Sequence, residues 1–203
     1  MIYFTSDLHL GHKNIIKLID RPFANVEEMN ETFIHHWNQK IQNNDTVYIL
    51  GDFTFKMNVL EAHNIIKQLH GHKILIKGNH DKNIDVSLFD EVCDFKIIKY
   101  HKQKFILMHY PLLEWPHYFQ GGIHLHGHQH NHRDYNELMR SKGIRRYDVG
   151  VDANEFYPVS IDEIIDFMEG SNESNKCQAN LKMSQKSLNI STKISVLLFC
   201  EII

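Results

Sequence analysis

Five short motifs in this chain combine aspartate, histidine and asparagine in ways that could bind metal ions. They are Asp7-Leu8-His9, Gly51-Asp52, Gly78-Asn79-His80-Asp81, His109 and Gly127-His128-Gln129-His130. Imidazole nitrogens and carboxylate oxygens suit Mn²⁺, Fe²⁺, Zn²⁺, Ni²⁺ or Co²⁺. No cysteine lies in these motifs, which removes any bias toward a structural zinc site.

The motifs differ in how specific they are. Asp7 with His9 fits a turn beside a surface histidine equally well, Gly-Asp is more often a plain turn, and a single His109 is usually a packed histidine. Gly-Asn-His-Asp is more specific, because four small or polar residues make a poor core and Gly78 indicates tight backbone geometry. Gly-His-x-His offers two imidazoles that can serve neighbouring centres. Their joint occurrence, in this order, favours a functional set.

Each motif directly follows an apolar segment that we expect to form a strand. These segments are Ile2–Thr5, Thr46–Leu50, Lys73–Lys77, Lys104–Met108 and Ile123–His126. Loops at strand ends are where layered α/β folds gather functional groups from distant parts of the sequence. The position of the motifs therefore supports the same interpretation as their composition.

Helical patterns alternate with these strands. We expect helices at Lys13–Ile19, after a capping box of Asn25 and Glu28, between residues 59 and 69, and at Ile161–Met168 behind Ser160 and Glu163. The second helix has one apolar stripe, made by Val26, Met29, Phe33, Trp37 and Ile41. Further strands are expected at Phe95–Tyr100 and Arg145–Val149. The alternation predicts an α/β layered domain with sheets inside and helices outside.

Composition limits the class of protein. The 203 residues, with 42% hydrophobic and 23% charged residues and a net charge of -3, predict a globular chain with one sizeable domain and no whole-chain attraction to nucleic acid. Three cysteines without CxxC spacing argue against a disulfide framework and favour a reducing cytoplasm. We expect no signal peptide and no membrane span, since no apolar run approaches ~18–20 residues.

The character of the chain changes at Gly170. We expect a catalytic domain over residues 1–169 and a flexible or unassigned tail over 170–203. Ser171–Ser191 is rich in Ser, Asn, Lys and Gln. The apolar Ile194–Ile203 leaves three interpretations open: it docks on the body, it pairs with another chain, or it is sequence that was never selected.

Taken together, residues 1–169 resemble the calcineurin-like metallophosphoesterase superfamily. The order Asp-x-His, Gly-Asp, Gly-Asn-His-Asp, His and Gly-His-x-His is complete in this chain. The opening Asp-x-His-x-Gly-His and the ending Val151-Asp152-Ala153 with Pro158-Val159-Ser160 are similar to small bacterial and phage members. The resemblance implies a four-layer α-β-β-α sandwich with two mixed central sheets.

The resemblance also implies the role of each residue. Asp7, His9 and His130 would hold a first metal, and Asn79, His109 and His128 a second. Asp52 would bridge both metals, and His80 would be a catalytic histidine that is not a ligand. The implied activity is hydrolysis of phosphate esters by a hydroxide that bridges two divalent metals, with Mn²⁺ the foremost choice.

Several neighbouring residues allow two interpretations. We expect His12 and Asn14 to contact the substrate, although His12 also fits an exposed residue at a helix start. Asp81 either orients His80 or caps a helix. Other residues are expected to be structural, namely Arg21 as a solvated or salt-bridged arginine, His124 and His126 as packing residues, and Asp152 and Asn154 as turn residues at the site rim. Trp115, Tyr118 and Phe119 fit a substrate wall or core packing equally well.

Two other functions stay open at this point. The first is a catalytically silent scaffold on the same fold, although such proteins usually lose ligands that are present here. The second is a nuclease, which would need a basic stripe near the site, and the candidates are Arg133, Arg140, Arg145 and Arg146. The sequence leaves monoester and diester substrates and the oligomeric state open, and admits nucleic acid as a substrate only.

Overall fold

The first sheet of this computed structural model, which describes residues 1–170, is built around three parallel strands. These are β1 (Ile2–Thr5), β2 (Thr46–Ile49) and β3 (His72–Ile76). The short β4 (Glu91–Cys93) adds in parallel beside β3, and β9 (Val159–Ser160) pairs antiparallel with β1, which gives the order β4-β3-β2-β1-β9. Valine, isoleucine and tyrosine dominate β2, as expected for a strand covered on both faces.

The second sheet begins with a hairpin. Strand β5 (Lys96–Tyr100) pairs antiparallel with β6 (Gln103–Leu107) across a two-residue connection, in which His101 adopts a φ of 50°. Strands β7 (Ile123–His126) and β8 (Arg146–Asp148) then add in parallel, in the order β5-β6-β7-β8. Both sheets are therefore mixed, and the α/β class expected from the sequence is confirmed at that level.

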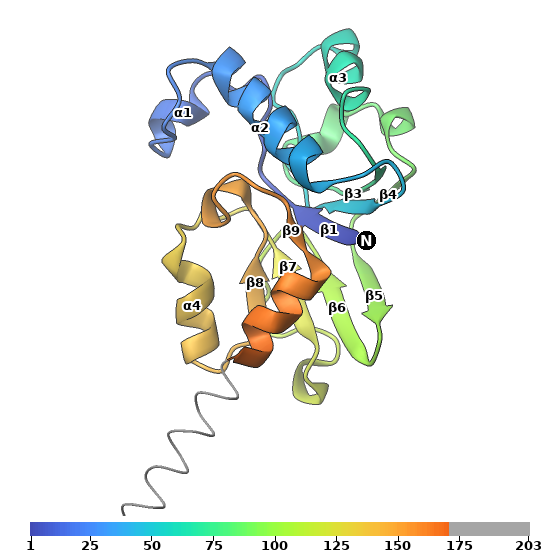
Figure 1. Ribbon diagram of the computed structural model, residues 1–203, viewed down its shortest axis with the longest axis vertical. Coiled ribbons are helices and arrows are strands. Elements are labelled where there is room, and N and C mark those ends of the chain that lie inside the picture. The colour runs from blue at the N-terminus through green and yellow to red at the C-terminus, as the bar shows by residue number, and fades with distance from the viewer. Residues whose placement is uncertain (171–203) are drawn as a thin grey trace, which may run out of the picture. The chain divides into compact units, whose positions relative to one another are not determined.

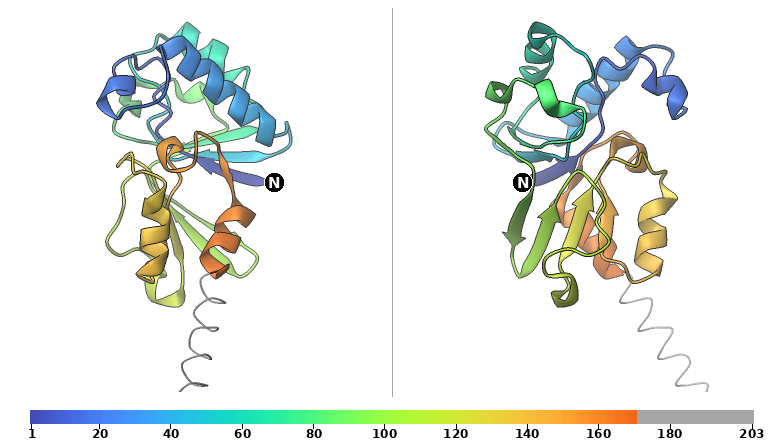
Figure 2. Two further views of the ribbon diagram at one scale, coloured as in Figure 1. Left: turned by 60° about the vertical axis from the view of Figure 1, so that its left-hand side comes forward. Right: turned by 180° about the vertical axis from the view of Figure 1, so that it is seen from behind.

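Helices lie on the outer sides of the two sheets. Helices α1 (Ile15–Leu18), α2 (Val26–Lys40) and α3 (Val59–Ile66) lie with the first sheet, whereas α4 (Asp134–Ser141) contacts β8 (Figures 1 and 2). The expected stripe of α2 is buried at Met29, Phe33 and Trp37, against residues of β2, β3 and α3. Helix α2 thus forms because its apolar spacing matches one helical face.

Aromatic side chains connect the two sheets. The ring of Phe4 in β1 stacks against Tyr48 in β2 at 5.6 Å and against Phe105 in β6 at 6.3 Å between centroids. Phe4 and Phe105 are fully buried. The opposite face of the first sheet packs against α2 and α3, so each face of this sheet has its own apolar cover.

The helix caps agree with the sequence. The side chain of Asn25 accepts a hydrogen bond from Glu28 N at 2.8 Å at the start of α2. Ser160 Oγ accepts from Glu163 N at 3.2 Å, and Glu163 accepts from Ser160 N at 2.7 Å, which completes the expected capping box before the helical residues 161–170. These caps bond backbone N–H groups that have no partner inside a helix.

Three elements were not expected from the sequence: β4, β9 and α4. The two strands are only three and two residues long, too short for a period to show. Helix α4 is mostly polar, and of its eight residues only Asn136 and Met139 are buried, so it has no apolar stripe. The helix expected at Lys13–Ile19 is also shorter, since α1 covers only Ile15–Leu18.

Short 3-10 turns join these elements, at Asp81–Asn83, Val86–Leu88, Tyr118–Gln120 and Val151–Ala153. Within residues 1–170, none of the helices combines the length and apolar character that crossing a bilayer requires. The expected tail over 170–203, including the apolar segment Ile194–Ile203, lies outside the described residues except for Gly170 itself.

Candidate metal centre

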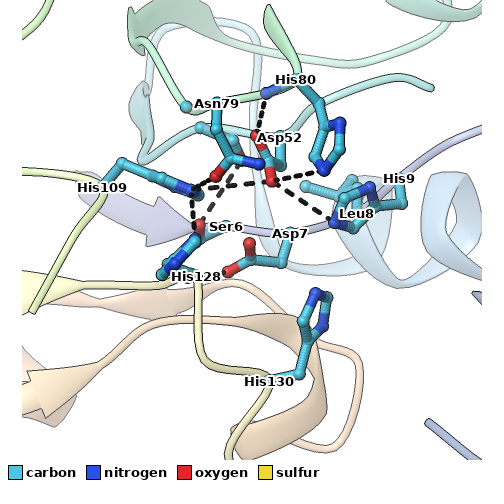
Figure 3. Close-up of polar contacts among 12 residues, drawn as sticks. Ser6, Asp7, Leu8, His9, Asp52, Asn79, His80, His109, His128 and His130 are labelled. Atoms are coloured by element: carbon cyan, nitrogen blue, oxygen red, sulfur yellow. Dashed lines mark hydrogen bonds and ion pairs between the residues drawn. The ribbon is translucent and has the colours of Figure 1, made fainter. Parts of the chain in front are cut away.

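The five motifs meet where the parallel strands of both sheets end. Strands β1, β2 and β3 of the first sheet, and β6 and β7 of the second, each lead directly into one motif. Backbone hydrogen bonds tie these loops together: Asp7 N donates to Gly51 O at 3.0 Å, His9 N to Asp52 O at 2.9 Å, and Gly127 N to His109 O at 3.0 Å. The two sheets therefore contribute side chains to one cluster (Figure 3).

One possible ligand set consists of Asp7, His9 and His130. Their ligand atoms all lie within 4.8 Å of one another. The rings of His9 and His130 stack at 5.1 Å between centroids. The structure thus brings together the three residues that the resemblance assigns to the first metal.

A second set consists of Asn79, His109 and His128. His109 Nε2 lies 2.9 Å from Asn79 Oδ1 and 3.2 Å from His128 Nδ1. His109 Nδ1 lies 2.7 Å from the carbonyl of Leu50, which can only accept, so Nδ1 carries the proton and Nε2 has a free lone pair. His109 Nε2 and Asn79 Oδ1 are then two acceptors that face each other at 2.9 Å, which favours a proton or a cation between them.

Asp52 lies between the two sets. Its Oδ2 is 3.5 Å from His9 Nε2 and 3.6 Å from His109 Nε2. Its Oδ1 accepts a hydrogen bond from the backbone N–H of His80 at 2.9 Å, which fixes the carboxylate. Asp7, Asp52 and His109 also form a group with ligand atoms within 4.8 Å, so both carboxylates are central to the cluster.

Buried polar atoms without partners test whether the cluster fits metal ions. Among residues 1–170, neither Asp7 Oδ1 nor the Nδ1 and Nε2 atoms of His9 have a hydrogen-bond partner, and all three are buried. Each such atom costs about 1–3 kcal/mol when it stays unpaired, and buried polar groups are rarely left so. A cation held by Asp7 Oδ1 and by the one His9 nitrogen that carries a lone pair would satisfy those two atoms, so the residues fit a metal centre.

The electrostatics of the cluster agree with this interpretation. Burial raises the pKa of Asp7 to about 8 and lowers the pKa of His9 to about 2. Both shifts have the same cause, because removal from water disfavours the charged form of each group. His9 is therefore neutral at ordinary pH, which is the state in which imidazole binds metal.

Five residues of the cluster have left-handed backbone conformations, with φ between 49° and 72°. They are Asp7, His9, Asp52, His128 and His130. Such conformations are uncommon for residues other than glycine, and they concentrate at functional sites where the surrounding fold holds them in place.

The glycines of the motifs are required by close packing. A Cβ atom on Gly78 would lie 2.2 Å from Asp52 Oδ1. A Cβ on Gly127 would lie 2.0 Å from Ser6 Oγ and 2.2 Å from Asp7 Oδ2. The backbone thus comes against both central carboxylates where no side chain would fit.

His80 lies at the edge of the cluster. Its side chain is 39% exposed, and its Nε2 is 3.9 Å from Asp52 Oδ2. The ring meets His9 edge-on at 5.3 Å and Phe55 at 5.1 Å between centroids. His80 is therefore close to the cluster and open to solvent, a position that suits proton exchange with a bound molecule.

Asp81 bonds to the backbone of the neighbouring loops. Its Oδ2 accepts from Asp52 N and Gly78 N, each at 2.8 Å, and its Oδ1 accepts from Phe53 N at 3.2 Å. The alternative of a helix cap is wrong, because His80 is the N-cap of the 3-10 turn, whereas a role of Asp81 in catalysis stays a prediction. Its buried carboxylate joins the loops that follow β2 and β3.

A buried ion pair supports the first set, and the sequence did not reveal it. Arg21 Nε and Nη2 donate to the two oxygens of Asp152 at 2.8 and 2.9 Å, and Nη2 also donates to Asp7 O at 2.7 Å. His130 Nδ1 lies 2.8 Å from Asp152 Oδ2, so it donates and leaves Nε2 free. Burial opposes ionisation of Asp152, but the His130 and Arg21 hydrogen bonds outweigh it and lower its pKa.

One of the two partners confirms an expectation and the other corrects one. Arg21 is a buried, salt-bridged arginine, which is one of the two interpretations expected for it. Asp152 was expected to be a turn residue at the rim, yet its side chain orients a residue of the cluster. Arg21 and Asp152 are 131 positions apart in the chain, so no local spacing could have indicated that they form an ion pair.

The remaining candidates lie in different places. The His12 ring stacks on Phe55 at 3.7 Å and lies 5.5 Å from the His9 ring, both measured between ring centroids, and burial lowers the pKa of His12. Asn14 is exposed at the start of α1, where its carbonyl accepts from Leu18 N at 3.0 Å. The structure therefore brings His12, and not Asn14, into contact with the cluster.

Other expected residues are structural. His124 and His126 are fully buried packing residues, as expected. Trp115 belongs to the core, with Nε1 donating to Gly122 O at 2.9 Å, whereas Phe119 is exposed. The four arginines proposed for a basic stripe bond within the protein. Arg133 pairs with Glu155, Arg140 with Glu137, Arg145 donates to Gly121 O, and Arg146 donates to Leu112 O.

Comparisons with known proteins identify relatives. No family model matches the chain. It is 40% identical over 170 residues to the uncharacterized protein MJ1445 of Methanocaldococcus jannaschii, covering 83% of this chain and 91% of that protein. It is 30% identical over 205 residues to the Gene 66 protein of Mycobacterium phage L5, covering 84% of this chain and 95% of the phage protein.

The chain is also similar to solved structures. The protein of unknown function AQ665 from Aquifex aeolicus is 32% identical with a TM-score of 0.67, covering 81% of this chain and 97% of that one. YfcE, a phosphoesterase from E. coli, is 17% identical with a TM-score of 0.37 over 79% of this chain and 81% of its own, too distant to inform the activity. The chain belongs to the family that includes MJ1445 and the phage L5 Gene 66 protein.

Proposed function

We propose that this protein is a dinuclear metal-dependent phosphoesterase, with the four-layer α-β-β-α sandwich of the calcineurin-like metallophosphoesterases. The observation that carries the proposal is the position of Asp52, whose Oδ2 lies 3.5 Å from His9 and 3.6 Å from His109 and so faces both ligand sets. A carboxylate can bridge two cations because it has two oxygens. The two mixed sheets with outer helices support the fold assignment.

The residues divide between two cations. Asp7, His9 and His130 would hold one, Asn79, His109 and His128 the other, and Asp52 both. When bound, divalent cations would polarise the phosphoryl oxygens and lower the pKa of a bound water, and Mn²⁺ suits these ligands. Only Asp7 and Asp52 bring negative charge to this set, so the loaded centre keeps a positive charge that attracts a phosphate ester.

His80 would act as the proton donor. Its ring is partly exposed beside the cluster and is not enclosed among the ligands, which lets it reach the oxygen that departs from phosphorus. Asp52 Oδ2 lies 3.9 Å from His80 Nε2, so the ring stays beside the carboxylate that faces both ligand sets. Phe55 packs against the ring and limits its orientations.

Two alternatives have less support. A silent scaffold has no need of two buried carboxylates and unpaired histidine nitrogens at one point. A nuclease that binds along a basic stripe would use arginines that are free to meet phosphates, whereas the four candidates have partners within the protein.

The first test is reconstitution with Mn²⁺ followed by assays on bis-p-nitrophenyl phosphate and p-nitrophenyl phosphate. We expect hydrolysis by the wild-type protein, and a loss of at least about 100-fold together with loss of bound metal in Asp52→Asn. Asp90→Asn is the control, because Asp90 is an exposed carboxylate away from the cluster. A wild-type protein that holds metal and cleaves neither ester would refute the proposal.

His80→Ala separates catalysis from metal binding. Loss of a proton donor lowers turnover by about 10²–10⁴-fold, while the metal content measured by elemental analysis stays at the wild-type value. If metal is lost as well, His80 is a ligand and the assignment of roles is wrong.

A further inference from the structure

A pocket of about 270 Å³ lies beside His80. The loop after β2 forms one wall, the segment after β3 forms another, and the start of α3 closes a third side. Its apolar lining comes from Phe55, Met57, Val59, Ala62, Ile84 and Leu88. Asn79 and His80 line its polar end.

The pocket is continuous with the candidate metal centre. Asn79, which lies 2.9 Å from His109 Nε2, belongs to both. His80 also belongs to both, since its Nε2 is 3.9 Å from Asp52 and its ring meets the wall residue Phe55. A molecule bound with its phosphate at the cluster can therefore extend into this space past His80.

The location of His80 indicates which part of a substrate would enter. This step depends on the proposed function, in which His80 protonates the departing oxygen. The group attached to that oxygen must then lie on the His80 side of phosphorus. The pocket on that side is the space that the leaving group would occupy.

The lining indicates the chemistry of that group. The apolar walls suit a ring system, although the Phe55 ring is already stacked against His12 and lies under Lys56 Nζ. Lys56 and Lys82 add positive charge, and within residues 1–170 neither lysine has an ion-pair partner. Asp85, the carboxylate in the lining, already accepts from Ser87 N at 3.0 Å and Ser87 Oγ at 2.7 Å. These neutral donors leave the charge of Asp85 in place, so the two lysines and the one carboxylate give the lining a net charge of +1, which favours an anionic group on the ligand.

The size of the pocket limits the ligand to one unit. About 270 Å³ is slightly below the ~300–1,000 Å³ typical of ligand pockets, so one base-sized group fits and an extended polymer does not. We propose that this pocket binds the leaving group of the substrate, and that this group is nucleotide-like, with one flat ring system and one additional anionic group held by Lys56 and Lys82.

Binding to the metal-free protein tests the pocket without relying on catalysis. The probes are adenosine 3′,5′-bisphosphate, adenosine 5′-monophosphate and ethyl phosphate, measured by calorimetry. We expect adenosine 5′-monophosphate to bind about tenfold or more tightly than ethyl phosphate, because the ring adds apolar contact. Lys82→Gln should reduce the preference for the bisphosphate over the monophosphate by about threefold or more.

A matched pair of variants tests the location. Val59 and Leu60 are adjacent on α3 and are 56% and 69% exposed, but only Val59 lines the pocket. Val59→Trp should weaken the binding of adenosine 3′,5′-bisphosphate about fivefold or more, because the larger side chain fills the pocket. The affinity of Leu60→Trp should stay within about twofold of wild type. Because both sites are exposed, neither variant should affect folding, which thermal melts would verify.

The outcomes separate this inference from the proposed function. If the Mn²⁺-loaded protein cleaves bis-p-nitrophenyl phosphate but Val59→Trp and Leu60→Trp bind the nucleotide equally, the pocket assignment is wrong and the hydrolase stands. If nucleotide binding is sensitive to Val59→Trp but the loaded protein cleaves no ester, the hydrolase is wrong and the leaving-group role fails with it. Both effects together support the inference.

Discussion

Strand β7 and the loop directly behind it contain four histidines at a spacing of two, and the two pairs have opposite roles. His124 and His126 lie in the strand and are fully buried. His128 and His130 follow Gly127, are half-buried, and face the candidate metal centre. Residue type and spacing are the same in both pairs, so they cannot account for the difference.

Hydrogen bonding in the strand explains the first pair. His124 Nδ1 lies 3.0 Å from Ile106 O, and His124 Nε2 accepts from Leu112 N at 3.1 Å. His126 Nδ1 lies 2.9 Å from Gly127 O. Burial lowers the pKa of His124 to about 4 and of His126 to about 3. These neutral rings have protein partners, which leaves them unavailable to a metal.

Backbone conformation explains the second pair. His128 and His130 have φ values of 72° and 49°, whereas the strand before them is extended. After Gly127, the His128 ring lies beside His109 and the His130 ring faces Asp7 (Figure 3), while the backbone N–H of His128 donates to Asp7 Oδ2 at 2.8 Å. The comparison shows that the backbone φ angle, together with the groups that it places near the ring, decides whether a histidine packs inside the strand or can serve as a ligand.

Removing a ring from the loop should have the largest effect. His128→Ala or His130→Ala is expected to lower metal affinity and phosphoesterase activity by at least about 100-fold, because each deletes a ligand. Elemental analysis after dialysis and an assay on bis-p-nitrophenyl phosphate measure the two effects. The thermal melt of the metal-free protein should change little. A variant that keeps its metal would show that the deleted ring is not a ligand, which contradicts the comparison.

The carboxylate behind the loop should have the next largest effect. Asp152→Asn keeps the shape of the side chain but weakens the acceptor for His130 Nδ1, so metal affinity should fall by about 10–100-fold. Competition with a chelating dye measures it. Asp162→Asn is the control, since Asp162 is outside the cluster and the change in net charge is the same. Equal affinities in the two variants would show that Asp152 does not support the ligand.

In the strand, the effect should fall on stability instead. His124→Ala leaves Ile106 O and Leu112 N without their partner, which should lower the free energy of unfolding by about 1–3 kcal/mol. Urea titration measures the loss. Metal stoichiometry should remain at the wild-type value, and a loss of metal in a folded variant would contradict the structural role.

The pH dependence should be the smallest effect. Because the pKa of His124 is about 4 when folded and near 6.5 when unfolded, the unfolded chain takes up the proton first as the pH falls. The free energy of unfolding of the metal-free protein should therefore decrease from about pH 6.5 toward about pH 4. The same direction holds for His126, whose folded pKa is about 3.

Urea titrations across that range, with metal removed by a chelator, measure the slope. The slope of the free energy of unfolding against pH should be smaller in His124→Gln than in wild type, by about 1.4 kcal/mol per pH unit, which is the contribution of one proton. Slopes that coincide would show that the ring of His124 is not kept neutral by the fold.

Much of the fold could be predicted because its main segments have strong local patterns. The apolar runs at Ile2–Thr5 and Ile123–His126 are strands with those bounds. The stripe of Met29, Phe33 and Trp37 is the buried face of α2. Polar α4 and the two-residue β9 could not be predicted, since they depend on contacts with distant residues and have little pattern of their own.

The sequence by itself determined which residues could bind metal and that each of them follows a strand, because residue type and hydrophobic pattern are local properties. Only the tertiary structure decided which histidines are packed and which face the cluster. It also paired Arg21 with Asp152, and it turned Asp81 toward the backbone of Asp52 and Gly78. These outcomes depend on φ angles and on partners far away in the chain, which no local pattern records.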